Sequence, residues 1–537
     1  MRRRIRTAVI AVLAIGCAAA IMAVASGGAS LNSGPALTDV ATANPKSPGL
    51  APASKLSPEL RQTAVAQGST KAENAGAVSY YGYDNDVLTA SGDPQMLPTP
   101  AVNNEAHKTE PDKNTYLVFR HGLPGADPSY DYGTRFLFQG HEGGSPGYIT
   151  RINLDADAAH RVTVLATTDT TGAPIADIDG STWDPWAHRL LFTTENQNAP
   201  TYSATPGYPS VVQDVSGALG RGGYEGIQND GDGNIWIVED IGGALKNGTR
   251  AKIPNSFIYR YVPRHPGDLA NGKLEVLQVL NAAGDPITLA SQTPLNSPDQ
   301  LALHVYGSSF RTRWVTIHDT ASDGNAPFNA NVRAKADHGT PFKRPENGVF
   351  RPGVHFEQFF FDETGDTDAN SPENANAGGW DSIFRLTQDG PSADHGHLSI
   401  FFRGDEAHAG FDNIQFLSRD SLGIVEDAGD TLHTQRNALD SGYAFDVDAD
   451  YSDPANQPVR WLAEGRDASA TLDSAFGGFA TGNEGDNEIT GLHVSNGDPS
   501  VHGVLGTQLP HLWHDGWRWF YTQQHGDNPT YEVIPSG

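Results

Sequence analysis

Short strand-like segments recur in pairs along this chain, and carboxylates stand at the ends of each pair. In one unit Glu225 opens a short apolar segment, residues 230–234 form a turn, and the aromatic run that follows ends in Glu239 and Asp240. We identify six such units, which begin near residues 179, 224, 298, 345, 411 and 488. An earlier segment, residues 135–142, resembles a partial seventh unit. Such a repeat must be explained before any single motif.

The segments between the turns are those of an all-β chain. The sequence holds 59 glycines and 35 prolines, and short β-branched or aromatic runs lie between turn signals. No long stretch has the 3.6-residue apolar period of a helix, which argues against a helical or doubly wound fold. Repeated short strands arranged around a ring are typical of a β-propeller. We therefore predict an all-β, β-propeller fold in which six blades are favoured and seven stay open.

This architecture would bring the repeated carboxylates together. The start of the first strand and the end of the second lie at the same end of an antiparallel hairpin, and the first strand of a blade lines the central channel. Carboxylates a few ångströms apart repel one another, and bound cations relieve the repulsion. The alternative is that acidic residues flank strands because turns favour them. The candidate metal ligands are Glu195, Glu225, Asp240, Asp299, Glu346, Glu363, Asp412 and Glu426.

Three regions are expected along the chain. Residues 1–30 have a basic start, an apolar stretch and small residues at Ala23-Val24-Ala25, which predicts a secretory signal peptide and an extracellular protein. A retained membrane anchor is the alternative, because the apolar stretch is nearly long enough to span a membrane. Residues 31–78 are rich in Ala, Ser, Pro and Gly and are predicted to form a disordered arm. Residues 79–537 are assigned to the propeller domain.

The net charge limits the classes of binding partner, and the cysteine content limits the metal ligands and nucleophiles that are available. The net charge is −28, and loss of the arginine-rich signal would make it more negative, so nucleic acid and anionic membrane are excluded as partners. We expect a monomer. The single cysteine, Cys17, lies inside the signal, so the mature protein has no disulfide, thiolate ligand or thiol nucleophile.

Several segments resemble those of one known family. They are Asp184-Pro185-Trp186 followed by Glu195, Leu219-Gly220-Arg221 followed by Glu225, Arg344-Pro345-Glu346, and Phe411-Asp412-Asn413 followed by Glu426-Asp427. Over residues 130–450 the chain is similar to the PhoX family of secreted, metal-dependent alkaline phosphatases, which are six-bladed propellers. The resemblance implies a cluster of iron and calcium that hydrolyses phosphomonoesters at the channel mouth. It also implies that Glu195, Glu225 and Glu346 bind metal and that Arg344 holds the phosphate of the substrate.

The chain departs from the family at one ligand. The family has a cysteine beside the glutamate matched by Glu195, whereas here the neighbours are Thr194 and Asn196. A donor set made only of oxygen favours calcium or another hard cation, with iron as the less suited choice. We therefore predict a secreted, metal-dependent phosphomonoesterase that acts on a small phosphorylated substrate at a carboxylate-rich site at one mouth of the channel, with calcium as the expected cofactor and iron as the alternative. The alternatives are a calcium-dependent lactonase-like propeller hydrolase and a non-catalytic, calcium-binding extracellular propeller.

Overall fold

Antiparallel strands make up most of the regular structure, which confirms the prediction of an all-β chain. The computed structural model describes residues 34–46, 53–96, 105–144, 146–246, 248–288, 297–466 and 488–537. The predicted signal peptide, residues 1–30, lies outside the described residues. In the described part of the chain, no helix has both the length and the apolar character needed to span a membrane.

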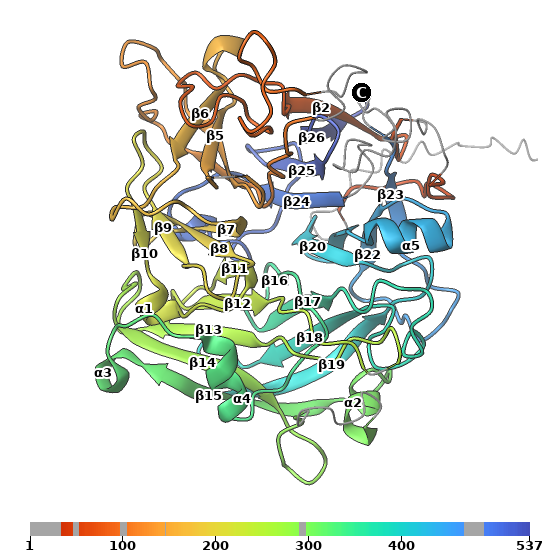
Figure 1. The fold of residues 1–537 in the computed structure, drawn as a ribbon. Helices are drawn as coiled ribbons and strands as arrows, with labels where there is room; N and C mark the ends of the chain where they lie inside the picture. Colours follow the sequence, from red (N-terminus) through yellow and green to blue (C-terminus); the bar gives the residue numbers. More distant parts are fainter. Residues whose placement is uncertain are drawn as a thin grey trace, which may run out of the picture.

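The strands form five sheets arranged around a common centre (Figure 1). Two of the four-stranded sheets are β3 (Thr115–Val118), β4 (Arg135–Gly140), β5 (Ile149–Asn153) and β6 (Val162–Ala166), and β7 (Ile178–Asp184), β8 (Arg189–Thr194), β9 (Tyr202–Ala204) and β10 (Val212–Asp214). The third holds β24 (Glu488–Ser495), β25 (Arg518–Gln524), β26 (Thr530–Pro535) and β2 (Leu60–Ala66). The five-stranded sheet holds β20 (Phe411–Phe416), β21 (Ser421–Glu426), β22 (Ser441–Asp446), β23 (Val459–Ala463) and β1 (Lys55–Leu56).

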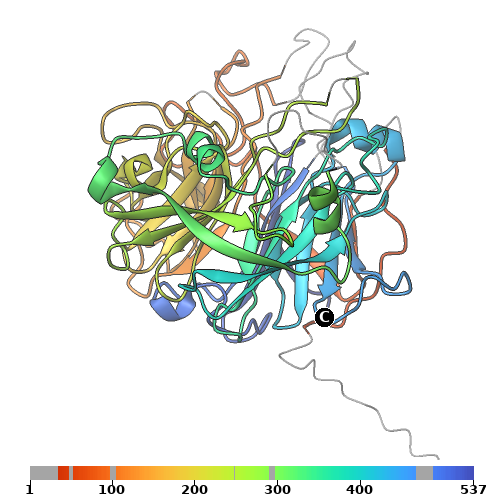
Figure 2. The same ribbon diagram turned by 90° about the horizontal axis from the view of Figure 1, so that it is seen from below.

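The remaining sheet has nine strands and contains two runs of consecutive antiparallel strands. The first run is β11 (Tyr224–Asn229), β12 (Ile235–Glu239), β13 (Ile258–Pro263) and β14 (Gly272–Val279), and the second is β16 (Gly348–Phe350), β17 (Gln358–Glu363), β18 (Ser382–Gln388) and β19 (His395–Arg403). The long strand β15 (Phe310–Asp319) pairs with β14 on one side and with β19 on the other. In Figure 2 this green strand crosses from the yellow-green strands to the cyan ones.

The first strands of these sets contact one another in a closed cycle. The contacts run from β3 to β7, β11, β16, β20 and β24, and then back to β3. Aromatic side chains fill the space between neighbouring sets. Trp236 of β12, for example, lies 4.8 Å from Phe359 of β17 and 5.0 Å from Trp314 of β15, measured between ring centres. Burying rings of this size stabilises the contact between the sheets by about 2 kcal/mol each. The propeller-like arrangement predicted from the sequence is therefore present.

Part of the predicted disordered arm is ordered, so that prediction is wrong for residues 55–66. Strand β1 pairs with β23, and β2 pairs with β26, which adds N-terminal strands to two C-terminal sheets. Leu60 and Ala66 of β2 are buried while the residues between them are mostly accessible, as on an edge strand. The overall Ala, Ser and Pro content of the arm concealed this short strand.

One of the six predicted strand pairs is also wrong. Residues 298–303 form the helix α2 (Pro298–Leu303) and not the first strand of a pair. The hydroxyl of Ser297 accepts a hydrogen bond from the N–H of Gln300, and a proline occupies the first helical turn, which together are a helix start signal. The remaining helices are α1 (Ser216–Leu219), α3 (Thr320–Asp323), α4 (Ala330–Ala336) and α5 (Gly429–Arg436). The partial unit at residues 135–142 belongs to the complete sheet β3–β6.

Candidate metal centre

Repeated β-bulges place carboxylates at the start of the first strands. The strand register shifts between Ile178 and Ser181 in β7, between Tyr224 and Ile227 in β11, and between Phe411 and Ile414 in β20. The acidic residues inside these shifts are Asp179, Glu225 and Asp412. A bulge bends its strand and re-aims the side chains within it, and bulges often lie beside active sites. The same local irregularity is thus used in several sheets to turn a carboxylate towards the centre.

Neighbouring first strands approach closely at these bulges. A side chain on Gly180 would lie 1.8 Å from the carbonyl oxygen of Glu225, so only glycine fits at this position. The hydroxyl of Thr193, near the end of β8, donates to the same carbonyl at 2.6 Å. On the next interface, the N–H of Gly226 donates to the carbonyl of Glu346 at 2.8 Å. These contacts hold the acidic residues of adjacent sheets at fixed separations.

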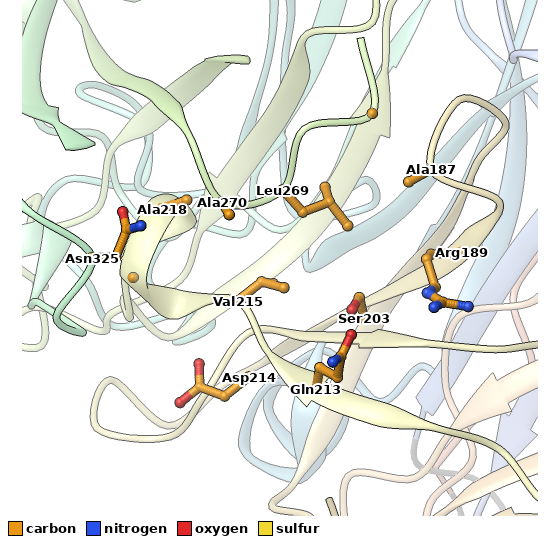
Figure 3. A pocket seen from close by; sticks show the side chains of 12 residues that line it. Ala187, Arg189, Ser203, Gln213, Asp214, Val215, Ala218, Leu269, Ala270 and Asn325 are labelled. Atoms are coloured by element: carbon orange, nitrogen blue, oxygen red, sulfur yellow. The ribbon is translucent and has the colours of Figure 1, made fainter. Parts of the chain in front are cut away.

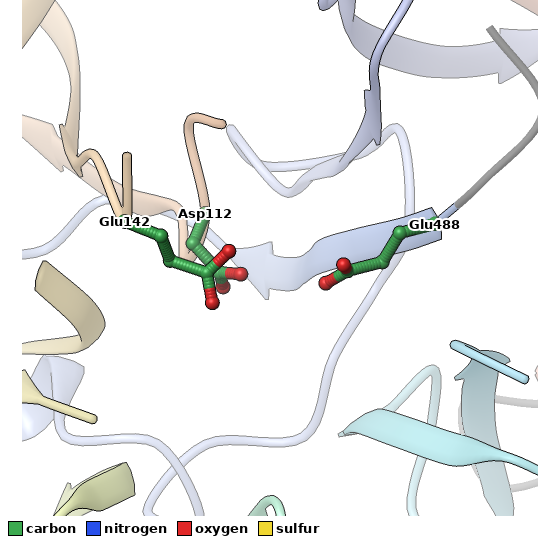
Figure 4. Close-up of side chains that lie close together, drawn as sticks. All are labelled: Asp112, Glu142 and Glu488. Atoms are coloured by element: carbon green, nitrogen blue, oxygen red, sulfur yellow. The ribbon is translucent and has the colours of Figure 1, made fainter. Parts of the chain in front are cut away.

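Seven carboxylates form a continuous row, which we call the acid row: Asp112, Glu142, Asp179, Glu195, Glu225, Asp240 and Glu488. They make three overlapping groups, within each of which one oxygen per residue lies within 4.8 Å of the others. The groups are Asp112, Glu142 and Glu488, then Glu142, Asp179 and Glu195, then Glu195, Glu225 and Asp240. Figure 4 shows Asp112 and Glu142 side by side, with Glu488 pointing towards them from β24. Glu142 and Glu195 each belong to two groups.

The electrostatics of the acid row suit the binding of cations. Burial, followed by repulsion from neighbouring carboxylates, holds the pKa of Glu142, Glu225 and Glu488 well above the ordinary value. Glu195 is an exposed residue at the rim, yet burial of its carboxyl group and the charge of Asp179 raise its pKa to about 7. So many adjacent carboxylates cannot all be ionised at neutral pH without compensating positive charge.

The chain itself supplies only part of that positive charge. The buried ammonium of Lys113 donates to the side-chain oxygen of Asn413 at 2.8 Å; burial lowers its pKa, and the nearby Asp412 and Asp112 partly offset this effect. Among the described residues, one buried oxygen of Asp240 and one of Asp412 have no hydrogen-bond partner. Unpartnered carboxylate oxygens and an all-oxygen donor set fit hard cations such as calcium. No thiolate is present among the described residues to favour iron.

Arg344 lies at one end of the acid row. Its Nε donates to Asp240 at 2.8 Å, and its terminal nitrogen lies 3.4 Å from Glu346. Burial alone would lower the pKa of this guanidinium, but the carboxylates of Asp240, Glu346 and Asp427 outweigh it and raise the pKa. The backbone of Arg344 has φ of 56°, a left-handed conformation that is strained for a residue with a side chain. The fold therefore holds one permanent cation beside the carboxylates.

Of the predicted ligands, the structure brings five to this region. Glu195, Glu225 and Asp240 share one group of the acid row. Glu346 is joined to the row through Arg344, and the hydroxyl of Thr364 lies 2.5 Å from its carboxylate. Burial raises the pKa of Asp412, and the charge of the nearby Asp179 raises it further.

Three predicted ligands bind other partners. Asp299 lies on α2 and accepts a hydrogen bond from the side chain of Asn281 at 3.2 Å. Glu363 is 3.0 Å from the ring of His304, and Glu426 is 3.1 Å from the guanidinium of Arg436.

These three carboxylates are therefore structural. Glu363 and Glu426 are each the last residue of a strand, whereas the row members Glu195 and Asp240 come immediately after a strand. A difference of one residue in position thus separates carboxylates that face the centre from carboxylates that pair with a residue at the end of a helix.

Four members of the acid row were not among the eight candidate ligands, although the repeat predicts Glu488 at the same channel mouth as Glu225 and makes Glu142 a secondary candidate: Asp112, Glu142, Asp179 and Glu488. Asp179 and Glu488 open strand pairs in the same phase as Glu225, so the repeat already contained the signal that could have identified them. Asp112 precedes β3, whose sheet was recognised only in part. Glu142 follows His141, which is buried and stacked on Tyr148 at 4.1 Å and is a packing residue.

A separate hollow of about 390 Å³ lies away from this region (Figure 3). It is bounded by Arg189, Gln213, Val215, Leu269 and Asn325, and it contains no member of the acid row. Its one carboxylate, Asp214, is held by Arg221 at 3.0 Å. We assign no role to this hollow.

The raised pKa values predict how the metal-free protein responds to pH. The pKa of Glu195 rises from 4.5 to about 7 and that of Asp427 from 3.8 to about 6 on folding. Protonation of these groups therefore contributes stability that is complete below the ordinary pKa and is lost as the pH rises through 6 and 7. The melting temperature of calcium-depleted protein should fall by several degrees between pH 5 and pH 8, and added calcium should restore it at pH 8. An unchanged melting temperature across this range would contradict the assignment.

The fold can be compared with that of known proteins. Neither a family model nor a curated protein sequence matches the chain. The structure of Pseudomonas fluorescens PhoX in complex with vanadate, a transition state analogue, is similar with a TM-score of 0.53 and 11% identity, over 94% of this chain and 98% of that one. A Xanthomonas campestris gluconolactonase has a TM-score of 0.33 and 11% identity, over 85% and 97% of the two chains. At these identities the comparison concerns the fold alone: the chain has a propeller-like fold similar to that of PhoX.

Proposed function

We propose that this protein is a secreted, metal-dependent phosphomonoesterase whose site is the acid row together with Arg344. The observation that carries the proposal is the adjacency of a permanently charged guanidinium to a row of carboxylates that needs cations. Arg344 offers a planar set of donors suited to a phosphate group. A lactonase or a non-catalytic calcium propeller would have no need of such a group beside its metal.

A second cationic side chain supports binding of a phosphate. Lys252 lies near Arg344, and burial, followed by repulsion from Arg344, lowers its pKa to about 8. Its ammonium is 3.4 Å from the hydroxyl of Thr367, and its backbone N–H donates to Asp366 at 2.8 Å. Arg344 and Lys252 together would orient the phosphoryl oxygens, while the acid row would hold the cations.

Calcium is the cofactor that we propose, with iron as the alternative. A hard cation, when bound, polarises a phosphoryl oxygen and lowers the pKa of a coordinated water. The overlapping groups of the acid row would hold several such cations, because Glu142 and Glu195 are each placed to serve two positions. Because Glu195 is exposed, water and substrate would reach the bound cations from this end of the acid row.

Other parts of the proposal concern architecture and location. We infer a six-bladed propeller, in which β15 joins two blades that share the nine-stranded sheet. The basic and apolar segment at residues 1–30 supports export and removal of a signal peptide. The substrate is a small phosphorylated molecule, since the net charge of −28 opposes binding of nucleic acid.

The direct test is a phosphomonoester assay on purified mature protein. We expect release of phosphate from p-nitrophenyl phosphate in calcium, loss of this activity in chelator, and its return when calcium is restored. Metal analysis of the same sample should find more than one calcium ion per chain. Folded protein that hydrolyses no phosphomonoester with any added divalent cation would refute the enzymatic proposal. Folded protein that retains no metal after gentle purification would refute the metal site itself.

A further inference from the structure

Four basic side chains share one face of the ladder between β15 and β19. In this antiparallel pair Arg311 is directly opposite His397, and Arg313 is directly opposite His395. Residues two apart on a strand point to the same side, so all four side chains project from one face. We call this set the basic ladder. The intervening Thr312 is buried on the other face.

The arginines of the basic ladder are held in place by the sheet. Nε of Arg313 donates to the side-chain oxygen of Gln278 at 2.7 Å, and the amide of Gln278 donates to the carbonyl of Asp337 at 2.7 Å. Gln278 is 3% exposed, so this chain of hydrogen bonds starts from a fixed buried group. The carbonyl of Arg311 accepts a hydrogen bond from the N–H of Leu280 at 2.8 Å. The guanidinium of Arg313 and the backbone of Arg311 are therefore positioned before any ligand arrives.

The positive charge of the basic ladder is not neutralised by the protein. Among the described residues, no ion pair joins Arg311, Arg313, His395 or His397 to a carboxylate. The nearby Asp394 lies 3.7 Å from Arg260, and the exposed Asp389 lines the same hollow without an ion pair to these four side chains. Arg311 and Arg313 carry permanent positive charges on the same face of one strand, where they repel each other. An uncompensated basic strip is unexpected in a chain of net charge −28.

The basic ladder also lines a hollow of about 660 Å³, which the exposed Thr387 borders as well. This volume is that of a site for a small molecule and is too small for a macromolecular interface. None of its lining residues belongs to the acid row. The paired guanidinium groups favour tetrahedral oxyanions, which accept several hydrogen bonds at once.

We propose that the basic ladder binds a small free molecule that carries two linked oxyanion groups of the phosphoryl or sulfonyl type. Side chains two apart on a strand are separated by about 7 Å and opposite ones by about 5 Å, so two anionic groups can be bound together. Because β15 joins two sets of strands at this point, the bound anion would also tie them together. This site is distinct from the proposed phosphomonoesterase site and does not depend on it.

The probe is ethane-1,2-disulfonate, which is not a phosphomonoester and chelates calcium weakly. At ten times its dissociation constant it should raise the melting temperature of the calcium-loaded protein by about 2 °C. Methanesulfonate at equal ionic strength should produce a much smaller shift. The double variant Arg311→Gln/Arg313→Gln should lose most of the shift, whereas Arg264→Gln, at an exposed position outside the hollow, should retain it.

The outcomes separate this site from other sources of stabilisation. An equal shift with both sulfonates, or an undiminished shift in the double variant, would overturn the proposal. If the double variant does not fold, as judged by far-ultraviolet circular dichroism, the pair His395→Gln/His397→Gln takes its place with the same expected loss. Arg344→Gln should keep the full shift, because its guanidinium lies at the acid row.

Discussion

The variant Glu195→Gln is expected to lose more calcium than a variant of any acid-row residue that belongs to only one of the three groups. Its activity should fall by about 100-fold or more. The reason is geometric, since the Glu195 carboxylate belongs to two of the three groups, whereas Glu488 belongs to one. Glutamine keeps the shape of the side chain but removes its charge. Metal analysis and the phosphomonoester assay on Glu195→Gln and Glu488→Gln would compare the two positions.

A control variant excludes a general effect of losing one charge. Glu357→Gln changes an exposed glutamate in the connection between β16 and β17, outside the acid row, and it should keep wild-type activity and calcium content. In calcium-free buffer Glu195→Gln should melt at a higher temperature than the wild type at pH 8, because it removes repulsion. Wild-type calcium content and activity in Glu195→Gln would show that the acid row is not the metal site.

Arg344→Ala is expected to lower kcat/KM by about 100- to 1,000-fold, the range seen when one preorganised donor to a developing charge is removed. The calcium content should not fall, because Arg344 competes with cations for Asp240 and Glu346. This combination, lost catalysis with retained metal, separates binding of phosphate from binding of metal. Arg344→Lys should recover only part of the activity, since an ammonium cannot form the paired hydrogen bonds of a guanidinium.

The exposed Arg264→Ala provides the matched control for loss of an arginine and should leave kcat/KM unchanged. If Arg344→Ala retained wild-type kcat/KM, Arg344 would be a structural partner of Asp240 and Glu346. If it lost calcium along with activity, its role would be to hold the carboxylates in place and not to bind the phosphate.

The repeat pattern predicted the architecture well where turn and strand signals agreed. The pairs around Glu225, Asp412 and Glu488 are present as β11–β12, β20–β21 and β24–β25. The prediction was wrong around Asp299, where the helix start signal at Ser297 and Pro298 outweighed the expected phase of the repeat. It was also wrong for β2, because an edge strand needs few apolar residues and leaves a weak pattern.

The site was predicted in part, and the reason lies in the bulges. A bulge inserts one residue and reverses which face a side chain occupies, so spacing along the chain cannot by itself separate Glu225 from Glu426. Glu426 pairs with Arg436 at the end of the helix α5, and no local motif predicts this partner. The acid row also depends on contacts between sheets distant in sequence, such as that of Asp112 with Thr490 at 2.8 Å. Such contacts follow only from the closed arrangement of the strands.

The pairing of β2 with β26 has a consequence for how the molecule is completed. This pairing joins residues 60–66 to residues 530–535, so the sheet that holds β24 is complete only when segments far apart in the sequence have met. At the other side of the same sheet, β24 contacts β3 of the neighbouring sheet, and there Glu488 of β24 meets Asp112 and Glu142, which flank β3 and β4. A cation held by these three residues would link the segment around β3 and β4 to the strand β24, which lies far from it in the sequence. Binding of the cation and closure of the ring of strands would then be coupled, so the calcium concentration around the protein would determine how much of it is fully folded.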